Sequence, residues 1–281
     1  MTHDPMEAMH KARKMLEAAG SPSAARDASA LIDKVQGDDP PWAPLSVAQM
    51  AELDRLIKRR ARREPISHIV GKRAFWMHDF IVTDAVLDPR PETETLVRAA
   101  NELIYDKKFE TILDLGTGSG CIVLSILSED RGLRGMGVDI SADALKVAER
   151  NADVVGVADR VTWAVSNWFE DVIDRFDLIV SNPPYIALDE MDSLDPELGF
   201  EPRIALTDEA DGLTAYRILT RDAPKHLTPG GALLVEFGAT QAADVTKLFA
   251  DAGFAEITAH QDLDGRDRAI SGIFPPQNDG I

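Results

Sequence analysis

The stretch ILDLGTGSG at residues 112–120 decides the fold of this 281-residue chain. Its apolar first half is typical of a buried strand, its glycines form a loop, and the apolar residues 120–128 predict a helix. Open α/β sheets bind ligands at the carboxyl ends of their strands, in turns of this kind. Because glycine lets the backbone approach a ligand closely, we expect a ligand site here, although a purely structural tight turn is the alternative.

The glycine spacing argues against two common nucleotide-binding loops. A dinucleotide-binding fingerprint needs a further glycine where Cys121 stands, and a P-loop needs a lysine that is absent nearby. What remains is a G-x-G-x-G loop directly after Asp114-Leu115. This spacing resembles the nucleoside loop of S-adenosylmethionine-dependent methyltransferases.

Two further residues fit a nucleoside site. Asp139 ends the next predicted strand, 23 residues beyond Gly116, where an acid can accept hydrogen bonds from both ribose hydroxyls. Trp168 follows the third strand and could flank the adenine. Taken alone, Asp139 could equally be an acid at a helix N-terminus, and Trp168 a packing residue.

Strands and helices alternate from residue 90 onwards, which predicts an α/β fold with a parallel sheet and right-handed crossovers. The predicted strands are 110–115, 134–139, 160–165, 176–181, 231–237, 254–260 and 268–274, and the predicted helices are 92–105, 120–128, 141–151, 212–226 and 239–252. The last two strands, joined by Asp264-Gly265, predict an antiparallel pair at the sheet edge.

The first part of the chain has a different pattern. Apolar and alanine residues recur at helical spacing near 5–19, 22–36 and 46–63, and residues 74–87 predict a hairpin with its turn near His78-Asp79. We therefore expect an N-terminal helical domain over residues 1–72, a hairpin linker over 73–89 and a larger domain over 90–281.

Charge is distributed unevenly. The net charge is −18, yet residues 1–75 carry a net charge of +3 and residues 76–281 a net charge of −21. Such an acidic body repels phosphate backbones, which disfavours duplex nucleic acid as a partner. The basic run at residues 58–63 is either a solvated helix end or a contact patch for an acidic or RNA-bound partner.

Cysteine usage and the lack of targeting signals predict a cytoplasmic protein. A single cysteine excludes an internal disulfide framework. No run of eighteen apolar residues predicts a transmembrane helix, and the N-terminal stretch lacks the apolar core of a secretory signal.

The fourth strand of the alternating region runs into two prolines, in DLIVSNPPYIAL at residues 177–188. Both prolines have a fixed φ, and Asn182 before them is pushed towards an extended conformation, so Asn182–Tyr185 forms a stiff spur. In a doubly wound sheet this strand end lies beside the glycine loop. A Pro-Pro turn of purely structural value is the alternative.

This spur suits a planar NH₂ nucleophile. The side-chain oxygen of Asn182 and the carbonyl of Pro183 can accept hydrogen bonds from its two N–H groups, and Tyr185 can stack on the planar group. Such a grip orients the nitrogen for in-line methyl transfer and offsets its developing charge, so no strong base is needed.

The Asn-Pro-Pro-Tyr motif is shared by methyltransferases of exocyclic base amines and of glutamine amides. Three more stretches, DPRPETE at 88–94, EPRIAL at 201–206 and DLDGRDR at 262–268, resemble the second group. With the helical N-terminal region, they resemble the peptide chain release factor glutamine methyltransferases, the HemK/PrmC family. The resemblance is strong over residues 65–274 and weaker over residues 1–64.

The resemblance implies a class I, Rossmann-like methyltransferase sheet whose cofactor is S-adenosylmethionine. It implies methylation of N5 of the glutamine in the Gly-Gly-Gln loop of class 1 release factors, tuning translation termination. The N-terminal domain would recognise the substrate. We expect a monomer without a metal, direct nucleic-acid binding or membrane association.

By motif, two sets of residues are expected to form the site. The cofactor set is Gly116, Thr117, Gly118, Ser119, Gly120, Asp139, Trp168 and Asn182, and the glutamine set is Asn182, Pro183, Pro184 and Tyr185. Arg90, Glu92 and Thr93 are expected against the cofactor pocket, or else form only a helix start. Asp88 and the VEFG stretch at 235–238 depart from the family pattern, and we expect the second to affect packing more than chemistry.

Two other classes of function stay open. A DNA adenine or ribosomal RNA guanine methyltransferase would usually carry a basic recognition domain. The basic run at residues 58–63 is the one feature of the sequence that favours this class. A catalytically silent scaffold would have no need of an intact Asn-Pro-Pro-Tyr motif.

Overall fold

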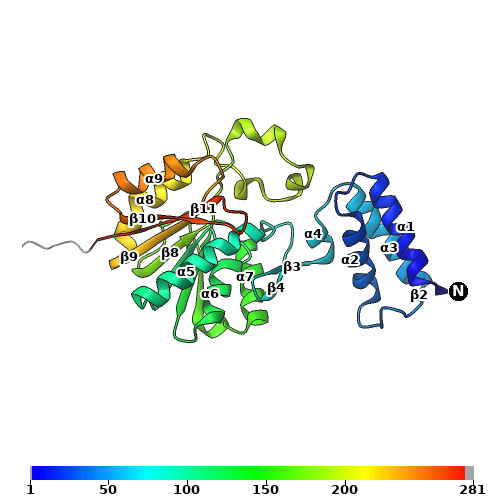
Figure 1. Ribbon diagram of the computed structural model, residues 1–281. Helices are drawn as coiled ribbons and strands as arrows, with labels where there is room; N and C mark the ends of the chain where they lie inside the picture. The colour runs from blue at the N-terminus through cyan, green and yellow to red at the C-terminus, as the bar shows by residue number, and fades with distance from the viewer. Residues whose placement is uncertain (1, 276–281) are drawn as a thin grey trace, which may run out of the picture. The chain divides into compact units, whose positions relative to one another are not determined.

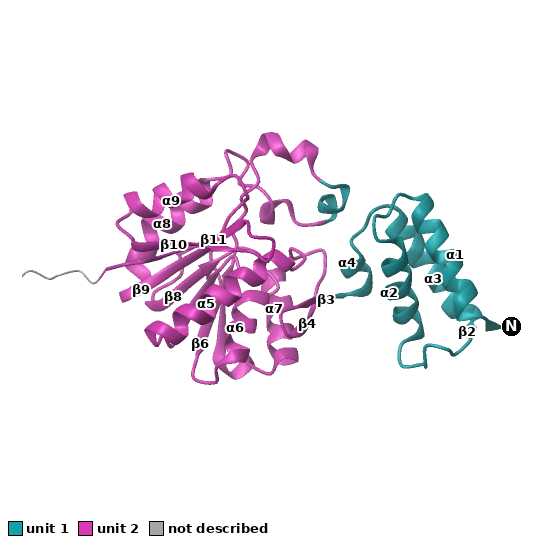
Figure 2. Ribbon diagram, in the orientation of Figure 1, with its two compact units in different colours: residues 1–72, 195–200 teal, residues 73–194, 201–281 magenta. Residues whose placement is uncertain are grey.

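The computed structural model describes residues 2–275, which form two compact units (Figure 2). The first unit comprises the residues up to Lys72 together with Asp195–Phe200. The second comprises Arg73–Leu194 and the residues from Glu201 onwards. Each unit has its own hydrophobic core. No helix among residues 2–275 is long and apolar enough to cross a membrane.

The first unit is helical, as predicted. Its elements are β1 (Thr2–His3), α1 (Pro5–Ala18), α2 (Ala24–Gln36), β2 (Leu45–Ser46), α3 (Val47–Ala61) and α4 (Ile66–Val70). Ser46 caps α3 in a capping box with Gln49, which fixes where that helix begins. Leu16, Leu31 and Leu53 are buried where the three long helices meet.

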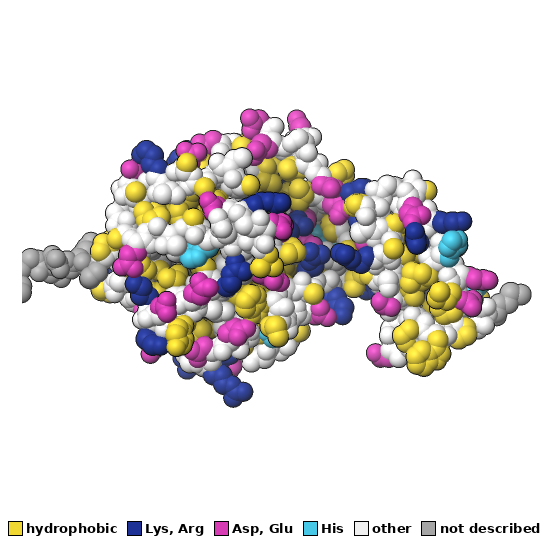
Figure 3. Space-filling model, in the orientation of Figure 1, with side chains coloured by type: hydrophobic (Ala, Val, Ile, Leu, Met, Phe, Trp, Pro, Cys, Tyr) yellow, Lys and Arg dark blue, Asp and Glu magenta, His cyan; other side chains and the backbone are white. Residues whose placement is uncertain are grey.

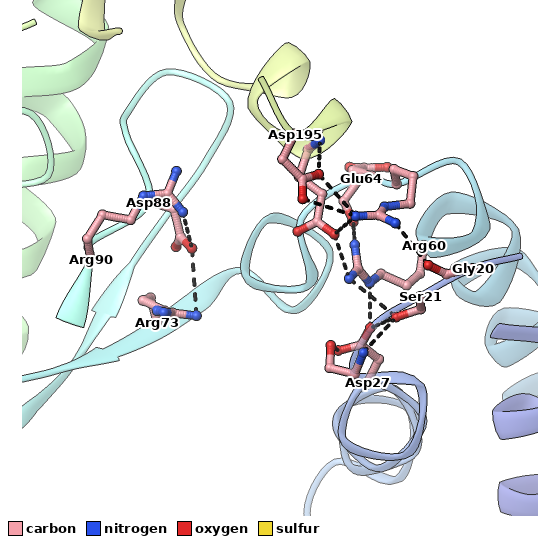
Figure 4. A network of polar contacts seen from close by, with 12 residues as sticks. Gly20, Ser21, Asp27, Arg60, Glu64, Arg73, Asp88, Arg90 and Asp195 are labelled. Atoms are coloured by element: carbon pink, nitrogen blue, oxygen red, sulfur yellow. Dashed lines mark hydrogen bonds and ion pairs between the residues drawn. The ribbon is translucent and has the colours of Figure 1, made fainter. Parts of the chain in front are cut away.

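Two arginines of the basic run, Arg60 and Arg63, form ion pairs inside this unit (Figure 4). The Arg60 side chain is only 2% exposed, and its Nε donates to Asp27 at 2.6 Å and its Nη2 to Glu197 at 2.9 Å. Arg63 donates to Asp195 at 3.0 Å. The prediction of a solvated helix end is therefore wrong for Arg60, because a buried carboxylate needs its charge neutralised.

Acidic and basic side chains are interspersed on the face of the molecule that Figure 3 shows.

The second unit is built on a seven-stranded sheet of order β10-β11-β9-β8-β5-β6-β7. Its strands are β5 (Thr111–Leu115), β6 (Arg134–Asp139), β7 (Val161–Val165), β8 (Phe176–Ser181), β9 (Leu227–Glu236), β10 (Ala255–Gln261) and β11 (Asp267–Ile273). Strand β11 pairs antiparallel with both β9 and β10, and the neighbours β9, β8, β5, β6 and β7 are parallel. The predicted antiparallel pair at the sheet edge is confirmed.

Helices cover both faces of this sheet (Figure 1). Helices α5 (Glu94–Lys107), α6 (Cys121–Glu129) and α7 (Ala142–Val155) lie on one face, and α8 (Thr214–His226) and α9 (Ala242–Asp251) on the other. Successive strand residues alternate between the two cores: Leu178 packs into one and Ile179 into the other. This alternation explains why the central strands are continuously apolar.

The predicted hairpin exists, but its turn was placed wrongly. Strands β3 (Lys72–Phe75) and β4 (His78–Ile81) are joined at Trp76-Met77, before His78-Asp79. Phe75 and Phe80 are both buried, with ring centroids 6.0 Å apart, so the apolar pair sets the register. Trp76 turns the chain with a φ of 53° while its backbone N–H donates to Glu94 at 2.8 Å.

Gly137 on β6 lies opposite Trp163 on β7, and it leaves no room for a side chain. A Cβ at Gly137 would stand 2.3 Å from a ring carbon of Trp163. We expect Gly137→Ala to lower the free energy of unfolding by about 1–3 kcal/mol through overpacking, measured by urea denaturation. Gly132→Ala, in an exposed turn, is the control and should change stability by less than about 0.5 kcal/mol. Equal losses in both variants would contradict this account.

Candidate active site

A cavity of about 570 Å³ lies at the carboxyl ends of four neighbouring parallel strands of the second unit. Gly116 follows β5, Asp139 ends β6, Trp168 follows β7 and Asn182 follows β8, and all four residues line the cavity. The volume lies within the usual range for small-molecule sites. The sheet topology thus brings together residues spread over 67 positions of the sequence.

The glycine loop faces this cavity with bare backbone. Gly116 and Gly118 line it with φ of 69° and 55°, and no atom lies within 4 Å of where a Cβ would be. Thr117, Ser119 and Gly120 do not line it. Thr117 Oγ1 instead donates to the buried Asp114 at 2.7 Å, and Gly120 stands at the N-cap of α6. Thr117 and Gly120 thus shape the loop, and Gly116 and Gly118 are its residues that face the cavity.

Asp139 ties the glycine loop to the start of α7. Its Oδ2 accepts from the backbone N–H of Gly118 at 2.9 Å, and its Oδ1 accepts from that of Ser141 at 2.8 Å. Burial raises the pKa of Asp139, and these backbone donors act in the opposite direction. A carboxylate has about four lone-pair sites, so both oxygens retain acceptor capacity towards the cavity.

Two buried residues, Thr93 and Glu236, hold the side-chain amide of Asn182 in place. Its Nδ2 donates to Thr93 Oγ1 at 3.1 Å, and the Thr93 hydroxyl in turn hydrogen-bonds the carboxyl of Glu236. Thr93 and Glu236 are each only 1% exposed, and burial raises the pKa of Glu236 to about 7. With its nitrogen engaged, Asn182 keeps its side-chain oxygen for another partner.

Glu236 therefore does more than the packing expected for the VEFG stretch. Sequence reasoning named Thr93 as a secondary candidate but missed its link to Glu236, which stands 143 positions further on. The departure of this stretch from the family pattern lies at Phe237, so the one signal for Glu236 was its place at the end of the predicted strand 231–237. A carboxylate at the end of an otherwise apolar strand needs a partner, and the structure supplies Thr93.

The other residues of the Asn-Pro-Pro-Tyr spur also differ in whether they line the cavity. Pro184 lines the cavity, whereas Pro183 and Tyr185 do not. The Tyr185 carbonyl accepts from Gln241 Nε2 at 2.9 Å, while Gln241 Oε1 accepts from the Gly238 backbone at 3.0 Å. Burial raises the pKa of the Tyr185 hydroxyl to about 12. Gln241 was missed because nothing in its local sequence distinguishes it from any other residue preceding a helix.

A return loop, residues 201–209, completes the cavity wall. Its buried Glu201 accepts from Arg90 Nη2 at 2.6 Å, so Arg90 fastens this loop and does not itself line the cavity. Asp88, the other departure from the family pattern, is 4% exposed with the guanidinium groups of Arg73 and Arg90 at 3.7 and 3.8 Å (Figure 4). Glu92 is exposed and does not line the cavity.

Comparisons with known proteins agree with this geometry. A family model described as a methyltransferase small domain matches residues 91–194, and a PrmC N-terminal domain model matches residues 7–71. A solved methyltransferase from Pyrococcus furiosus aligns with a TM-score of 0.53 at 16% identity, covering 78% of this chain and 98% of that one. The sheet, the glycine loop and the acid on the next strand define a class I S-adenosylmethionine-dependent methyltransferase.

Curated relatives narrow the class. A release factor glutamine methyltransferase of Cereibacter sphaeroides is 46% identical, covering 96% of this chain and 98% of that protein. One from Agrobacterium fabrum is 41% identical, covering 92% and 94%. The chain belongs to the release factor glutamine methyltransferase family. It is accordingly an S-adenosylmethionine-dependent protein-glutamine methyltransferase.

Proposed function

We propose that this enzyme methylates N5 of the glutamine in the Gly-Gly-Gln loop of a class 1 release factor, acting in the cytoplasm as a monomer. The observation that carries the proposal is the Asn182 amide, whose nitrogen is bound by Thr93 and whose oxygen is left for a substrate at the cavity that the glycine loop lines. S-adenosylmethionine, when bound, supplies an electrophilic methyl group.

Residues of the spur hold the substrate amide. The side-chain oxygen of Asn182 and the backbone carbonyl of Pro183, which stands between the lining residues Asn182 and Pro184, accept hydrogen bonds from its two N–H groups. These bonds turn the nitrogen lone pair towards the methyl group. The rigid prolines fix these two acceptors, and Gln241 fixes the turn through the Tyr185 carbonyl. The same acceptors stabilise the positive charge that develops on nitrogen.

Residues at the neighbouring strand ends hold the cofactor. Gly116 and Gly118 allow close approach of the backbone, Asp139 accepts from the ribose hydroxyls, and Trp168 flanks the adenine. Thr117, Ser119 and Gly120 keep the loop in shape. The cavity volume, the bare glycine backbone and the remaining acceptor capacity of Asp139 all support this assignment.

Replacing the Asp139 carboxylate should weaken cofactor binding. We expect Asp139→Asn to raise the Kd for S-adenosylmethionine by about ten- to a hundredfold, because hydrogen bonds to a charged group contribute roughly 1.5–3 kcal/mol. Isothermal titration calorimetry measures the change. Asp143→Asn is the control, since Asp143 is an exposed acid on α7 paired with Lys146. Similar Kd values for both variants would remove Asp139 from the site.

The first unit recognises the body of the release factor in this proposal, while the cavity receives the glutamine. A dedicated helical unit with its own core and a matching PrmC N-terminal domain model supports a separate recognition role.

A transfer assay tests the proposed function. Radiolabelled S-adenosylmethionine is offered with a class 1 release factor, with the same factor carrying alanine in place of its loop glutamine, and with a mixture of DNA and ribosomal RNA. We expect label on the intact factor only. Label on the nucleic acids would instead mean that the spur holds a base amine.

A further inference from the structure

We propose that Glu236 is a positioning residue for the methyl transfer: through Thr93, it sets which end of the Asn182 amide faces the cavity. The inference rests on the proposed function, in which the Asn182 oxygen accepts a hydrogen bond from an N–H group of the substrate amide.

Three separate elements bring these side chains together. Glu236 is the last residue of β9, Asn182 directly follows β8, and Thr93 precedes α5. Strands β8 and β9 are neighbours, with Ser181 paired to Val235, so their carboxyl ends lie side by side. The Glu236 side chain is almost fully buried, and its Oε2 has no hydrogen-bond partner among the described residues.

The direction of the hydrogen bonds follows from the ionised carboxylate. A carboxylate only accepts, so the single hydroxyl hydrogen of Thr93 must go to Glu236. The Thr93 oxygen then accepts, and its partner at Asn182 must be the NH₂ group. The Asn182 oxygen is consequently left for the substrate amide.

An uncharged group at position 236 removes this constraint. A glutamine, or a protonated Glu236, can donate to Thr93 and release the hydroxyl hydrogen of Thr93. Thr93 can then donate to the Asn182 oxygen, and the side-chain amide of Asn182 rotates by half a turn, so that its oxygen and nitrogen exchange places. An Asn182 NH₂ group would now face the NH₂ group of the substrate, donor against donor, which disfavours the productive pose.

The charge state of Glu236 changes near neutral pH. Burial raises its pKa to about 7, while the hydrogen bond from Thr93 and the cations lower it. The titratable and charged groups that act on Glu236, or on which it acts, are Arg90, Glu92, Tyr185, Tyr216, Arg268 and Cys121. The constraint on Asn182 therefore holds above about pH 7 and weakens below it.

Glu236→Gln tests the inference by kinetics. At pH 8 we expect kcat for release-factor methylation to fall at least tenfold, with KM changed less than threefold. The wild-type kcat should decline as pH falls from 8 to 6, whereas that of Glu236→Gln should stay flat. Thr93→Ser, which keeps the hydroxyl, should retain activity, and Thr93→Val should lose it.

Asp177→Asn is the matched control. Asp177 is a carboxylate at the opposite end of the same sheet, where it accepts from Thr111 and Thr228. This variant should have a lower Tm but keep the wild-type dependence of kcat on pH. A Glu236→Gln enzyme with wild-type kcat and pH profile would overturn the inference.

A second measurement does not depend on turnover. The side-chain NH₂ resonances of Asn182, assigned by their loss in Asn182→Ala, should shift with a midpoint near pH 7 in the wild type and be independent of pH in Glu236→Gln. Failure of the wild type to methylate the factor would refute the proposed function and leave this readout intact. Wild-type resonances that ignore pH would overturn the role of Glu236 even in an active methyltransferase.

Discussion

Asn182→Ala is expected to lower kcat for release-factor methylation by about 10²- to 10³-fold, which corresponds to roughly 3–4 kcal/mol of transition-state stabilisation. The side-chain oxygen of Asn182 is one of two acceptors proposed to orient the substrate nitrogen, and the network behind it holds it in place before the substrate arrives. Alanine removes that acceptor without touching Pro183 or the glycine loop. Single-turnover kinetics with radiolabelled S-adenosylmethionine measures the chemical step.

Asn101→Ala provides the matched control for this substitution. Asn101 lies on α5, within the same unit, and does not line the cavity. Its kcat should equal that of the wild type, and both variants should melt within a few degrees of it. If Asn182→Ala methylates the factor at a near-normal rate, the proposed grip on the amide is wrong.

Arg60→Ala is expected to destabilise the first unit by about 3–5 kcal/mol. The substitution leaves Asp27, which is 1% exposed, without the guanidinium that neutralises it, and breaking one side of a buried ion pair costs about this much. Glu197 loses the same partner. Hydrogen exchange followed by mass spectrometry should show faster exchange in α2 and α3, because these helices carry the pair.

Arg62→Ala tests whether the effect belongs to the buried pair and not to the basic run as a whole. Arg62 makes its hydrogen bond, to the Lys58 carbonyl, in an exposed setting, so its loss should change stability by less than about 0.5 kcal/mol.

Arg60→Ala should also raise KM for whole release factor far more than for a short peptide containing Gly-Gly-Gln. Equal increases for both substrates would argue against a recognition role for the first unit.

Local sequence patterns predicted the elements of both units well. The helices of the first unit and the strands of the second follow from apolar periodicity, and the glycine loop and the strand ends at Asp139 and Asn182 place the cavity. Because parallel strands align their carboxyl ends, a list of strand ends was enough to bring distant residues together.

Features set by tertiary contacts were not predictable in this way. The hairpin turns at Trp76 because Phe75 and Phe80 must pack together, although His78-Asp79 has the more turn-like composition. Arg60 is buried because two carboxylates from other parts of the chain meet it. Glu236 and Gln241 have their roles because of hydrogen-bond partners on other elements. A single sequence does not reveal which residues those partners are.

Asp195–Phe200 belongs to the first unit although the residues on either side belong to the second. The boundary between the units is therefore crossed three times along the chain. A chimera made with one breakpoint near residue 72 would exchange α1–α4 but leave behind Glu197, the partner of Arg60. Under the proposed recognition role of the first unit, exchange of substrate preference between relatives would need a matched hexapeptide, and Arg60, Arg63, Asp195 and Glu197 should be inherited together.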